Sequence, residues 1–154
     1  MVTTYPGLRF QYGLLRVVAR LPSTRGLWSG VWLGATTFQW PPEIDLIEYW
    51  GTKTNGVGVP GVFFHPYGGP RLAAEPAVGN LSVGWHTFAL DWTPTQLTWS
   101  IDGRVVLSTN QHVPQQPMFL VVDLAYSSGN LALMKSGAGC HGTLYVKSVK
   151  LWQE

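Results

Sequence analysis

Residues 43–50 read Glu-Ile-Asp-Leu-Ile-Glu-Tyr-Trp and place three carboxylates, those of Glu43, Asp45 and Glu48, within six positions. The whole chain has only eight Asp and Glu residues. The intervening Ile, Leu and Ile favour an extended, half-buried strand. Because side chains alternate along a strand, Glu43 and Asp45 point the same way, whereas Glu48 points to the opposite face of a regular strand.

A β-bulge between Asp45 and Glu48 takes up one extra residue and so returns Glu48 to the face of Glu43 and Asp45. Bulges concentrate near active sites. We therefore predict that the three acids share one face of the strand. Ile44 and one or both of Leu46 and Ile47 then turn into the core.

Three like charges on one strand have two interpretations. The plainer one is an amphipathic strand with a solvated acidic face. The other is glycoside hydrolysis, which needs one ionised carboxylate as nucleophile and one protonated carboxyl group to release the leaving oxygen. Repulsion between neighbouring acids separates their pKa values, and Asp45, between the two Glu residues, is placed to tune them. A curved sheet would bring the outer carboxylates to the separation of about 5–5.5 Å found in retaining enzymes.

The segment from Trp40 to Tyr49 (WPPEIDLIEY) resembles the active-site strand of the family 16 glycoside hydrolases. It is most similar to the bulged form found in endo-β-1,3-glucanases, agarases and carrageenases. The resemblance implies that Glu43 is the nucleophile, Glu48 the acid/base and Asp45 the residue that modulates Glu43. It extends over nearly the whole chain from Tyr12 onward. It implies a retaining endo-glycosidase acting on β-1,3-linked or mixed-linkage glucan, with a polysaccharide as partner.

Composition limits the other classes of protein. A chain of 154 residues with 45% hydrophobic and 12% charged residues fits a single globular domain. The net charge of +2 comes from scattered Lys and Arg, which excludes a clustered nucleic-acid interface. No apolar run is long enough to span a membrane. The single cysteine, Cys140, cannot form an internal disulfide, and no Cys/His spacing indicates zinc, its neighbour His141 being expected in a loop. The eight Trp residues favour carbohydrate, because aromatic rings stack on the apolar faces of sugars.

Short alternating segments, with no helical period, predict an all-β sandwich of two antiparallel sheets with about ten strands. With the resemblance, this is a concanavalin A-like jelly roll. Asp102-Gly103 is a strong hairpin signal, and residues 67–80 read as a long loop beside the substrate. The predicted strands cover residues 12–21, 26–34, 43–50, 57–65, 85–92, 97–101, 116–125 and 143–152.

Three further residues are expected to bind substrate. Trp40 precedes the acidic strand, and the resemblance favours a place beside Glu43 over simple packing. The resemblance also places His65, at the end of the next strand, facing the cleft. Trp28 and Trp32 lie four residues apart and share a face of their strand. We expect Trp28 to reach the cleft and Trp32 to be buried in the core.

The sequence also departs from the family pattern. Where the family usually carries an acidic residue followed two places on by Arg, this chain has Arg16 and Val18, which is expected to rearrange a charge pair near the cleft. Many relatives place a calcium-binding Asp in the last strand, but Lys147 stands there, and a cation cannot bind calcium. We therefore predict no metal and no cofactor.

The N-terminus leaves the largest open question. Residues 1–154 are expected to form one catalytic domain that lacks the family's first strands, since residues 1–11 can supply at most one strand. No signal peptide is visible, although enzymes that digest polysaccharide usually work outside the cell, and we expect a secreted monomer. Two alternatives remain, a non-catalytic carbohydrate-binding or lectin-like module and a non-functional fragment. The sequence does not distinguish β-glucan, agarose and carrageenan as the substrate.

Overall fold

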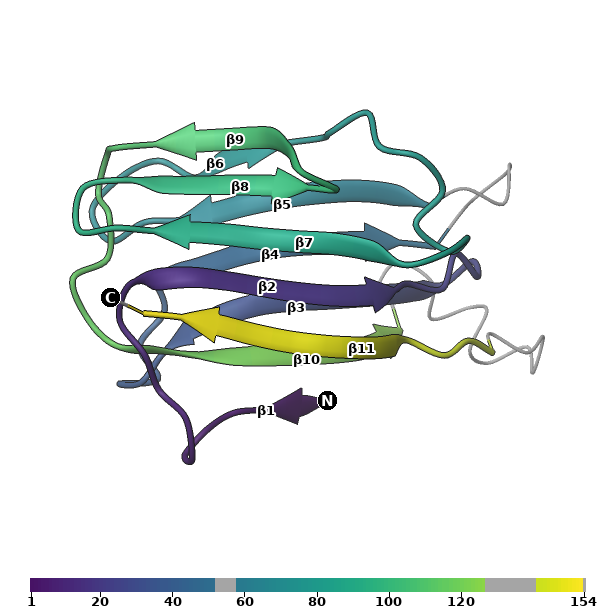
Figure 1. The fold of residues 1–154 in the computed structure, drawn as a ribbon, viewed down its shortest axis with the longest axis horizontal. Helices are drawn as coiled ribbons and strands as arrows, with labels where there is room; N and C mark the ends of the chain where they lie inside the picture. The colour runs from purple at the N-terminus through teal and green to yellow at the C-terminus, as the bar shows by residue number, and fades with distance from the viewer. Residues whose placement is uncertain (52–57, 127–140, 154) are drawn as a thin grey trace.

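The computed structural model describes residues 1–51, 58–126 and 141–153, which form two packed β-sheets (Figure 1). This described part of the chain contains eleven strands. No helix in it is long and apolar enough to cross a bilayer. The strands are β1 (Val2–Thr3), β2 (Gly13–Arg20), β3 (Leu27–Ala35), β4 (Glu43–Trp50), β5 (Val59–His65), β6 (Leu72–Ala74), β7 (His86–Trp92), β8 (Leu97–Ile101), β9 (Arg104–Thr109), β10 (Met118–Tyr126) and β11 (Tyr145–Trp152).

The strands are antiparallel throughout and lie in two layers. The six-stranded sheet has the order β1-β10-β3-β4-β5-β6, and the five-stranded sheet has the order β11-β2-β7-β8-β9. In Figure 1 the five-stranded sheet lies in front of the six-stranded one. The predicted all-β sandwich is confirmed. β4, which carries the three acids, lies in the interior of its sheet between β3 and β5.

The core fills the space between the two layers. The inward positions of β2 and β8 are buried at every second residue, as an amphipathic strand requires. Its largest fully buried side chains are aromatic, and burial of each such side chain contributes roughly 1.5–3 kcal/mol. They are Trp92, Trp99, Tyr49, Phe64 and Phe88.

The predicted strands match the observed ones to within a few residues at each end. At the predicted hairpin, Asp102 and Gly103 have φ values of 50° and 80°, the left-handed conformation that both central residues of a type I′ turn adopt. β6 is a correction, because it lies inside the predicted loop at residues 67–80 and its three residues are too few to show a period. Residue 57, where the predicted strand 57–65 begins, and Cys140 lie outside the described residues. His141 lies in irregular structure, as expected.

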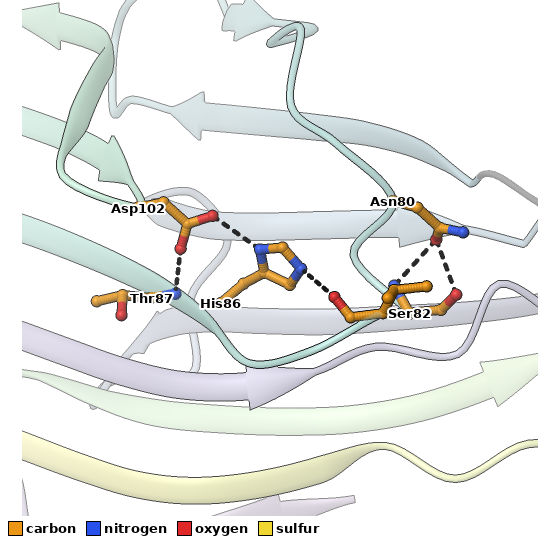
Figure 2. A network of polar contacts seen from close by, with 6 residues as sticks. Asn80, Ser82, His86, Thr87 and Asp102 are labelled. Carbon is orange, nitrogen blue, oxygen red and sulfur yellow. Dashed lines mark hydrogen bonds and ion pairs between the residues drawn. The ribbon is translucent and has the colours of Figure 1, made fainter.

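The β8–β9 hairpin is joined to the segment before β7 by a polar network (Figure 2). His86 Nδ1 lies 2.7 Å from Asp102 Oδ2, and His86 Nε2 lies 3.1 Å from the backbone oxygen of Val83. The other oxygen of Asp102 accepts a hydrogen bond from the Thr87 amide at 2.8 Å. These contacts lie in the five-stranded sheet and fix the start of β7.

The first eleven residues cross an edge of the six-stranded sheet. Val2 and Thr3 pair with β10, and Phe10 makes an isolated bridge to Met118. This segment thus supplies one two-residue strand, in agreement with the sequence-based limit of one.

Candidate active site

The predicted bulge is present in β4. On the β5 side, Asp45 pairs with Phe63 and Glu48 with Gly61, so two residues of β4 oppose the single residue Val62 of β5. Leu46 and Ile47, the two residues between the acids, are both buried. The bulge therefore keeps the apolar residues in the core while it changes the direction of Glu48.

The three acids lie on one face because their partners alternate evenly. Glu43, Asp45 and Glu48 pair in turn with positions 65, 63 and 61 of β5, and with positions 34, 32 and 30 of β3. Partners two residues apart point to the same face of their strand. Since the buried Ile44 lies between Glu43 and Asp45, this shared face is the outer face of the six-stranded sheet. The central geometric prediction is confirmed.

Glycines on both sides of Glu48 make room for aromatic rings. A Cβ atom at Gly30 would lie 2.8 Å from Cη2 of Trp28, and one at Gly61 would lie 2.5 Å from the ring of Phe63. Side chains larger than glycine would displace these rings. The rings exclude water from the surroundings of Glu48, which is itself half-buried.

This environment changes the pKa of Glu48. Burial is the largest cause, and the negative charge of Glu43 is the next, so the pKa rises from 4.5 to about 7. A hydrogen bond from the Trp28 side chain and the positive charge of Arg71 act in the opposite direction. Glu48 is thus a carboxyl group that holds its proton in weakly acidic solution, as a general acid must.

Asp45 is the most buried of the acids, with 1% of its surface exposed. Burial, followed by the charges of Glu43 and Glu48, raises its pKa well above the ordinary value. Its Oδ2 atom has no hydrogen-bond partner among the described residues. Asp45 therefore favours the protonated form and limits the negative charge that accumulates between the two Glu residues.

His65 and Trp40 lie at the Glu43 end of the site. His65 Nε2 is 3.8 Å from Glu43 Oε1 and 3.8 Å from Asp45 Oδ2. Burial lowers the pKa of His65, and the charge of Glu43 opposes this shift, so these are contacts of a mainly neutral imidazole at pH 7. The exposed ring of Trp40 lies 5.3 Å from the His65 ring, centroid to centroid. The structure thus places His65 at the acids, and Trp40 against His65.

The two tryptophans of β3 both lie on the acidic face. Trp28 approaches Glu48 as predicted, and Trp32 shares its face. The predicted core position of Trp32 is wrong. Its ring is half-buried on the outer face, pairs across from Asp45, and donates a hydrogen bond from Nε1 to Asp123 Oδ1 at 3.3 Å. A tryptophan on this face keeps its N–H near a polar partner, which the core does not provide.

The bulge is held from below by the opposite sheet. Trp99 in β8 is fully buried, and its Nε1 donates a hydrogen bond of 3.0 Å to the backbone oxygen of Asp45. A bulge interrupts the regular ladder, and its backbone groups need other partners. The indole N–H of Trp99 supplies one at the residue between the two Glu side chains.

Three residues of the site carried no clear sequence signal. Arg71 lies over the ring of Phe63, 5.0 Å from its centroid, and its charge acts on both Glu48 and His65. Asp123 raises the pKa of Glu48 from β10. Trp99 is one of the alternating apolar residues of its strand. Each reaches the site through strand pairing or layer packing rather than through chain neighbours.

Arg16 requires a further correction. The sequence placed it near the cleft, but β2 belongs to the five-stranded sheet, and Arg16 is exposed there, 5.3 Å from the ring of Trp152. The altered charge pair is therefore on the other layer of the sandwich. Lys147 also lies in this layer, in the irregular part of β11 between Val146 and Ser148.

Two further observations bear on ligands. Ligand atoms of Glu43, Asp45 and His65 lie within 4.8 Å of one another, a spacing that suits a cation, although protonation of Asp45 weakens such a site. A cavity of about 470 Å³ lies between β1, β10 and β11; Asp123 lines it, but Glu43, Asp45 and Glu48 do not. The acids instead occupy the open outer face of the sheet.

The chain is similar to known proteins in sequence and in structure. Residues 6–139 match the model of the family described as glycosyl hydrolases family 16. The endo-1,3-1,4-beta-glycanase ExsH of Rhizobium meliloti is 30% identical over 127 residues, which are 81% of this chain and 27% of that protein. The chain thus spans about a quarter of the length of this curated relative.

Two solved laminarinase structures are also similar to this chain. The laminarinase from Rhodothermus marinus has a TM-score of 0.71 and 26% sequence identity, over 81% of this chain and 58% of that one. The laminarinase from Flavobacterium sp. has a TM-score of 0.75 over 98% of this chain and 71% of that one, and at 22% identity it supports the fold alone.

Proposed function

The chain belongs to family 16 of the glycosyl hydrolases, and we propose that it is a retaining endo-glycosidase that hydrolyses β-1,3-linked or mixed-linkage glucan by double displacement. The observation that carries the proposal is the pairing of Glu43 with a Glu48 whose pKa is about 7, on one face of one bulged strand. The two relatives named above, an endo-1,3-1,4-beta-glycanase and a laminarinase, support this choice of substrate.

In the first displacement the Glu43 carboxylate attacks the anomeric carbon and forms a glycosyl ester. The glycosidic bond breaks at the same time, and Glu48 gives its proton to the departing oxygen. In the second displacement the ionised Glu48 takes a proton from water, and the resulting hydroxide opens the ester and frees Glu43. The raised pKa of Glu48 is what suits it to both roles.

Asp45 has a supporting role in this scheme. Because burial raises its pKa, Asp45 favours a neutral carboxyl group, rather than a second negative charge, next to the nucleophile. His65 contacts both carboxyl groups from β5 and holds their orientation. Trp40, packed against His65, and Trp28, beside Glu48, offer aromatic faces for sugar rings at the two ends of the acidic row.

The test separates the roles of the two Glu residues. We expect laminarin hydrolysis, measured as released reducing ends, to be lost in Glu43→Ala and in Glu48→Ala. Azide added with an aryl β-glucoside substrate should then rescue each variant differently. Glu43→Ala should form the glycosyl azide of inverted configuration, and Glu48→Ala the azide of retained configuration, because only the latter still forms the enzyme ester.

The contrary outcomes are equally distinct. If the parent chain binds laminarin in calorimetry but releases no reducing ends after long incubation, the protein is a carbohydrate-binding module instead. If both variants keep the parent rate, the assignment of Glu43 and Glu48 is wrong. Parallel incubation with agarose and carrageenan tests the choice of glucan, since the bulged strand is also found in enzymes for those polymers.

The same proposal includes the state in which the protein works. We propose that residues 1–154 act as one catalytic domain, monomeric and outside the cell, with polysaccharide as the partner. Light scattering coupled to size-exclusion chromatography measures the mass directly. A mass of twice 17.0 kDa would contradict the monomer.

A further inference from the structure

The outer face of the five-stranded sheet carries cations and aromatic rings along β2 and β11, which lie side by side in Figure 1. Arg16 pairs with Lys150, and Arg20 pairs with Tyr145. The seven residues from Leu14 to Arg20 extend about 20 Å at the usual rise of a strand. We call the following set the basic strip: Arg16, Arg20, Trp85, Tyr145, Lys147 and Trp152.

The cations of the basic strip lie over its rings. The guanidinium carbon of Arg20 is 4.5 Å from the centroid of Tyr145 and 5.8 Å from that of Trp85. Lys147 Nζ is 5.7 Å from the centroid of Trp85. A guanidinium group stacked on aromatic faces is held in plane while its N–H groups stay available at the edge. The strip thus presents pre-oriented donors for an anion.

These cations have no acidic partner in the described part of the chain. Each ion pair found there involves a histidine, and none involves Arg16, Arg20 or Lys147. The three rings are also open to solvent, with exposed fractions of 47% for Trp85, 45% for Tyr145 and 46% for Trp152. The strip therefore combines positive charge that is not neutralised with aromatic surface that is not covered.

A groove adjoins the Trp152 end of the strip. Its volume is about 620 Å³. Amide, hydroxyl and carboxylate groups line it together with the Trp152 ring, a combination that suits a polar ligand with one apolar face. The polar and aromatic residues that line this groove are Gln11, Tyr12, Asp91, Trp92, Thr93, Trp152 and Gln153.

We propose that the basic strip and its groove form a second carbohydrate-binding site, specific for an acidic polysaccharide that carries carboxylate or sulfate groups. A sugar ring occupies the groove against Trp152, and the acid groups of the same chain reach the N–H donors of Arg16 and Arg20. The site lies on the layer opposite the catalytic acids. It anchors the protein to an acidic matrix without using Glu43 or Glu48, and so it goes beyond the proposed hydrolysis and does not depend on it.

The features favour a polysaccharide over other polyanions. The groove supplies hydrogen-bonding groups around one aromatic wall, which matches a pyranose ring. The chain as a whole carries a net charge of only +2, too little for the broad electrostatic attraction that dominates binding to nucleic acid.

The test compares three probes on the full chain by calorimetry: carboxymethylated laminarin, neutral laminarin, and a single-stranded DNA oligonucleotide. The Glu43→Gln variant serves as the common background, so that no probe is cut. We expect the carboxymethylated polymer to bind more tightly than laminarin and the DNA to bind weakly. Arg16→Gln with Arg20→Gln should weaken binding of the carboxymethylated polymer about tenfold or more and leave laminarin unchanged.

Arg9→Gln with Arg104→Gln is the matched control, because it removes the same charge from exposed positions outside the strip. It should change the affinity by about twofold at most. If the double variant fails to fold, Lys147→Gln alone takes its place, and it should weaken binding of the carboxymethylated polymer about threefold. Equal loss in strip and control variants, equal binding of both laminarins, or DNA binding that matches the acidic polymer would each overturn the proposal.

Discussion

The two outer faces of the sandwich carry opposite charge in different surroundings. The six-stranded sheet presents Glu43, Asp45, Glu48 and Asp123, which are four of the eight acidic residues of the chain. The outer face of the five-stranded sheet presents the basic strip. The acids lie buried or half-buried among rings, whereas the cations lie above rings that face solvent.

This contrast shows how one fold prepares charge for two uses. On the acidic face, burial penalises ionisation and raises the pKa values of Asp45 and Glu48, which makes protons available for transfer. On the basic face, exposure leaves the charge intact and the rings only orient it, which suits binding. Burial, rather than the sign of the charge, separates a face built for proton transfer from one built for attraction.

The largest expected effect comes from a substitution on the acidic face. Glu48→Gln removes the proton donor and should reduce laminarin hydrolysis by about 10²–10⁴-fold. On an aryl β-glucoside with an acidic phenol as leaving group, the loss in the first displacement should be much smaller, because that leaving group needs no proton. Burst kinetics on the aryl substrate measure the first displacement. Equal losses on both substrates would contradict the role of Glu48 as acid.

The next effect tests the support beneath the acids. Trp99→Phe leaves the backbone oxygen of Asp45 without its donor, which should cost about 1–3 kcal/mol of stability and reduce kcat about tenfold, with little change in KM. Trp92→Phe is the matched control. Trp92 is equally buried, but its Nε1 has no hydrogen-bond partner among the described residues. If Trp99 had a purely structural role, Trp99→Phe would lose stability through its missing hydrogen bond but, like Trp92→Phe, would keep kcat and the pH profile of the parent.

The pH dependence of activity tests how burial and the charge of Arg71 set the pKa of Glu48. The first displacement needs protonated Glu48, so kcat/KM should fall as the pH rises through about 7. Arg71 lowers the pKa of Glu48, and Arg71→Gln should therefore move this limb to higher pH. Initial rates on laminarin in buffers of constant ionic strength measure both profiles. A limb that stays in place in Arg71→Gln would contradict the interaction.

The pH dependence of the stability should report the same ionisation of Glu48. The folded-state pKa of Glu48 is about 7 against an ordinary value of 4.5, so between these values the folded chain binds the proton more tightly than the unfolded chain. The stability of the parent chain should therefore fall as the pH rises through this window. Glu48→Gln lacks this penalty, and its Tm relative to the parent should increase from pH 4.5 to 7 and then stay level. Thermal melts across this range, with Glu75→Gln as an exposed control, test the sign.

The smallest expected effect concerns the polar network of Asp102 at the β8–β9 hairpin, which belongs neither to the acidic face nor to the basic strip. Asp102→Ala removes the acceptor of the Thr87 amide and the contact with His86, and should lower stability by about 1 kcal/mol. Asp102→Asn, which keeps an oxygen acceptor and tolerates the positive φ, should lose less. Chemical denaturation measures both variants. Activity on laminarin and binding to the acidic polymer should not change.

The sequence predicted the features that depend on chain neighbours. Alternation along β4 and the spacing of its acids indicated a bulge, because only one extra residue brings Glu48 to the face of Glu43. Asp102-Gly103 indicated a hairpin, because few dipeptides accept two positive φ values. The short β6 escaped prediction, since three residues show no period.

Side-chain direction across layers was the weaker part of the prediction. The placement of Trp32 in the core and of Arg16 near the cleft failed for one reason. A strand's pattern separates its two faces but does not say which sheet it joins or which face meets the other layer. Pairing of β3 with β10 and of β2 with β11 decided both cases.

The sequence by itself determined the bulged acidic strand and the all-β class. It also indicated Trp40, ahead of β4, and His65, at the end of β5, as residues of the site. Only the tertiary structure decided the indole of Trp99 beneath the bulge, the action of Arg71 and Asp123 on Glu48, and the gathering of the basic strip. The reason is physical. Alternation and turn conformation are local properties of the backbone, whereas burial and electrostatic interaction depend on which distant strands pack together.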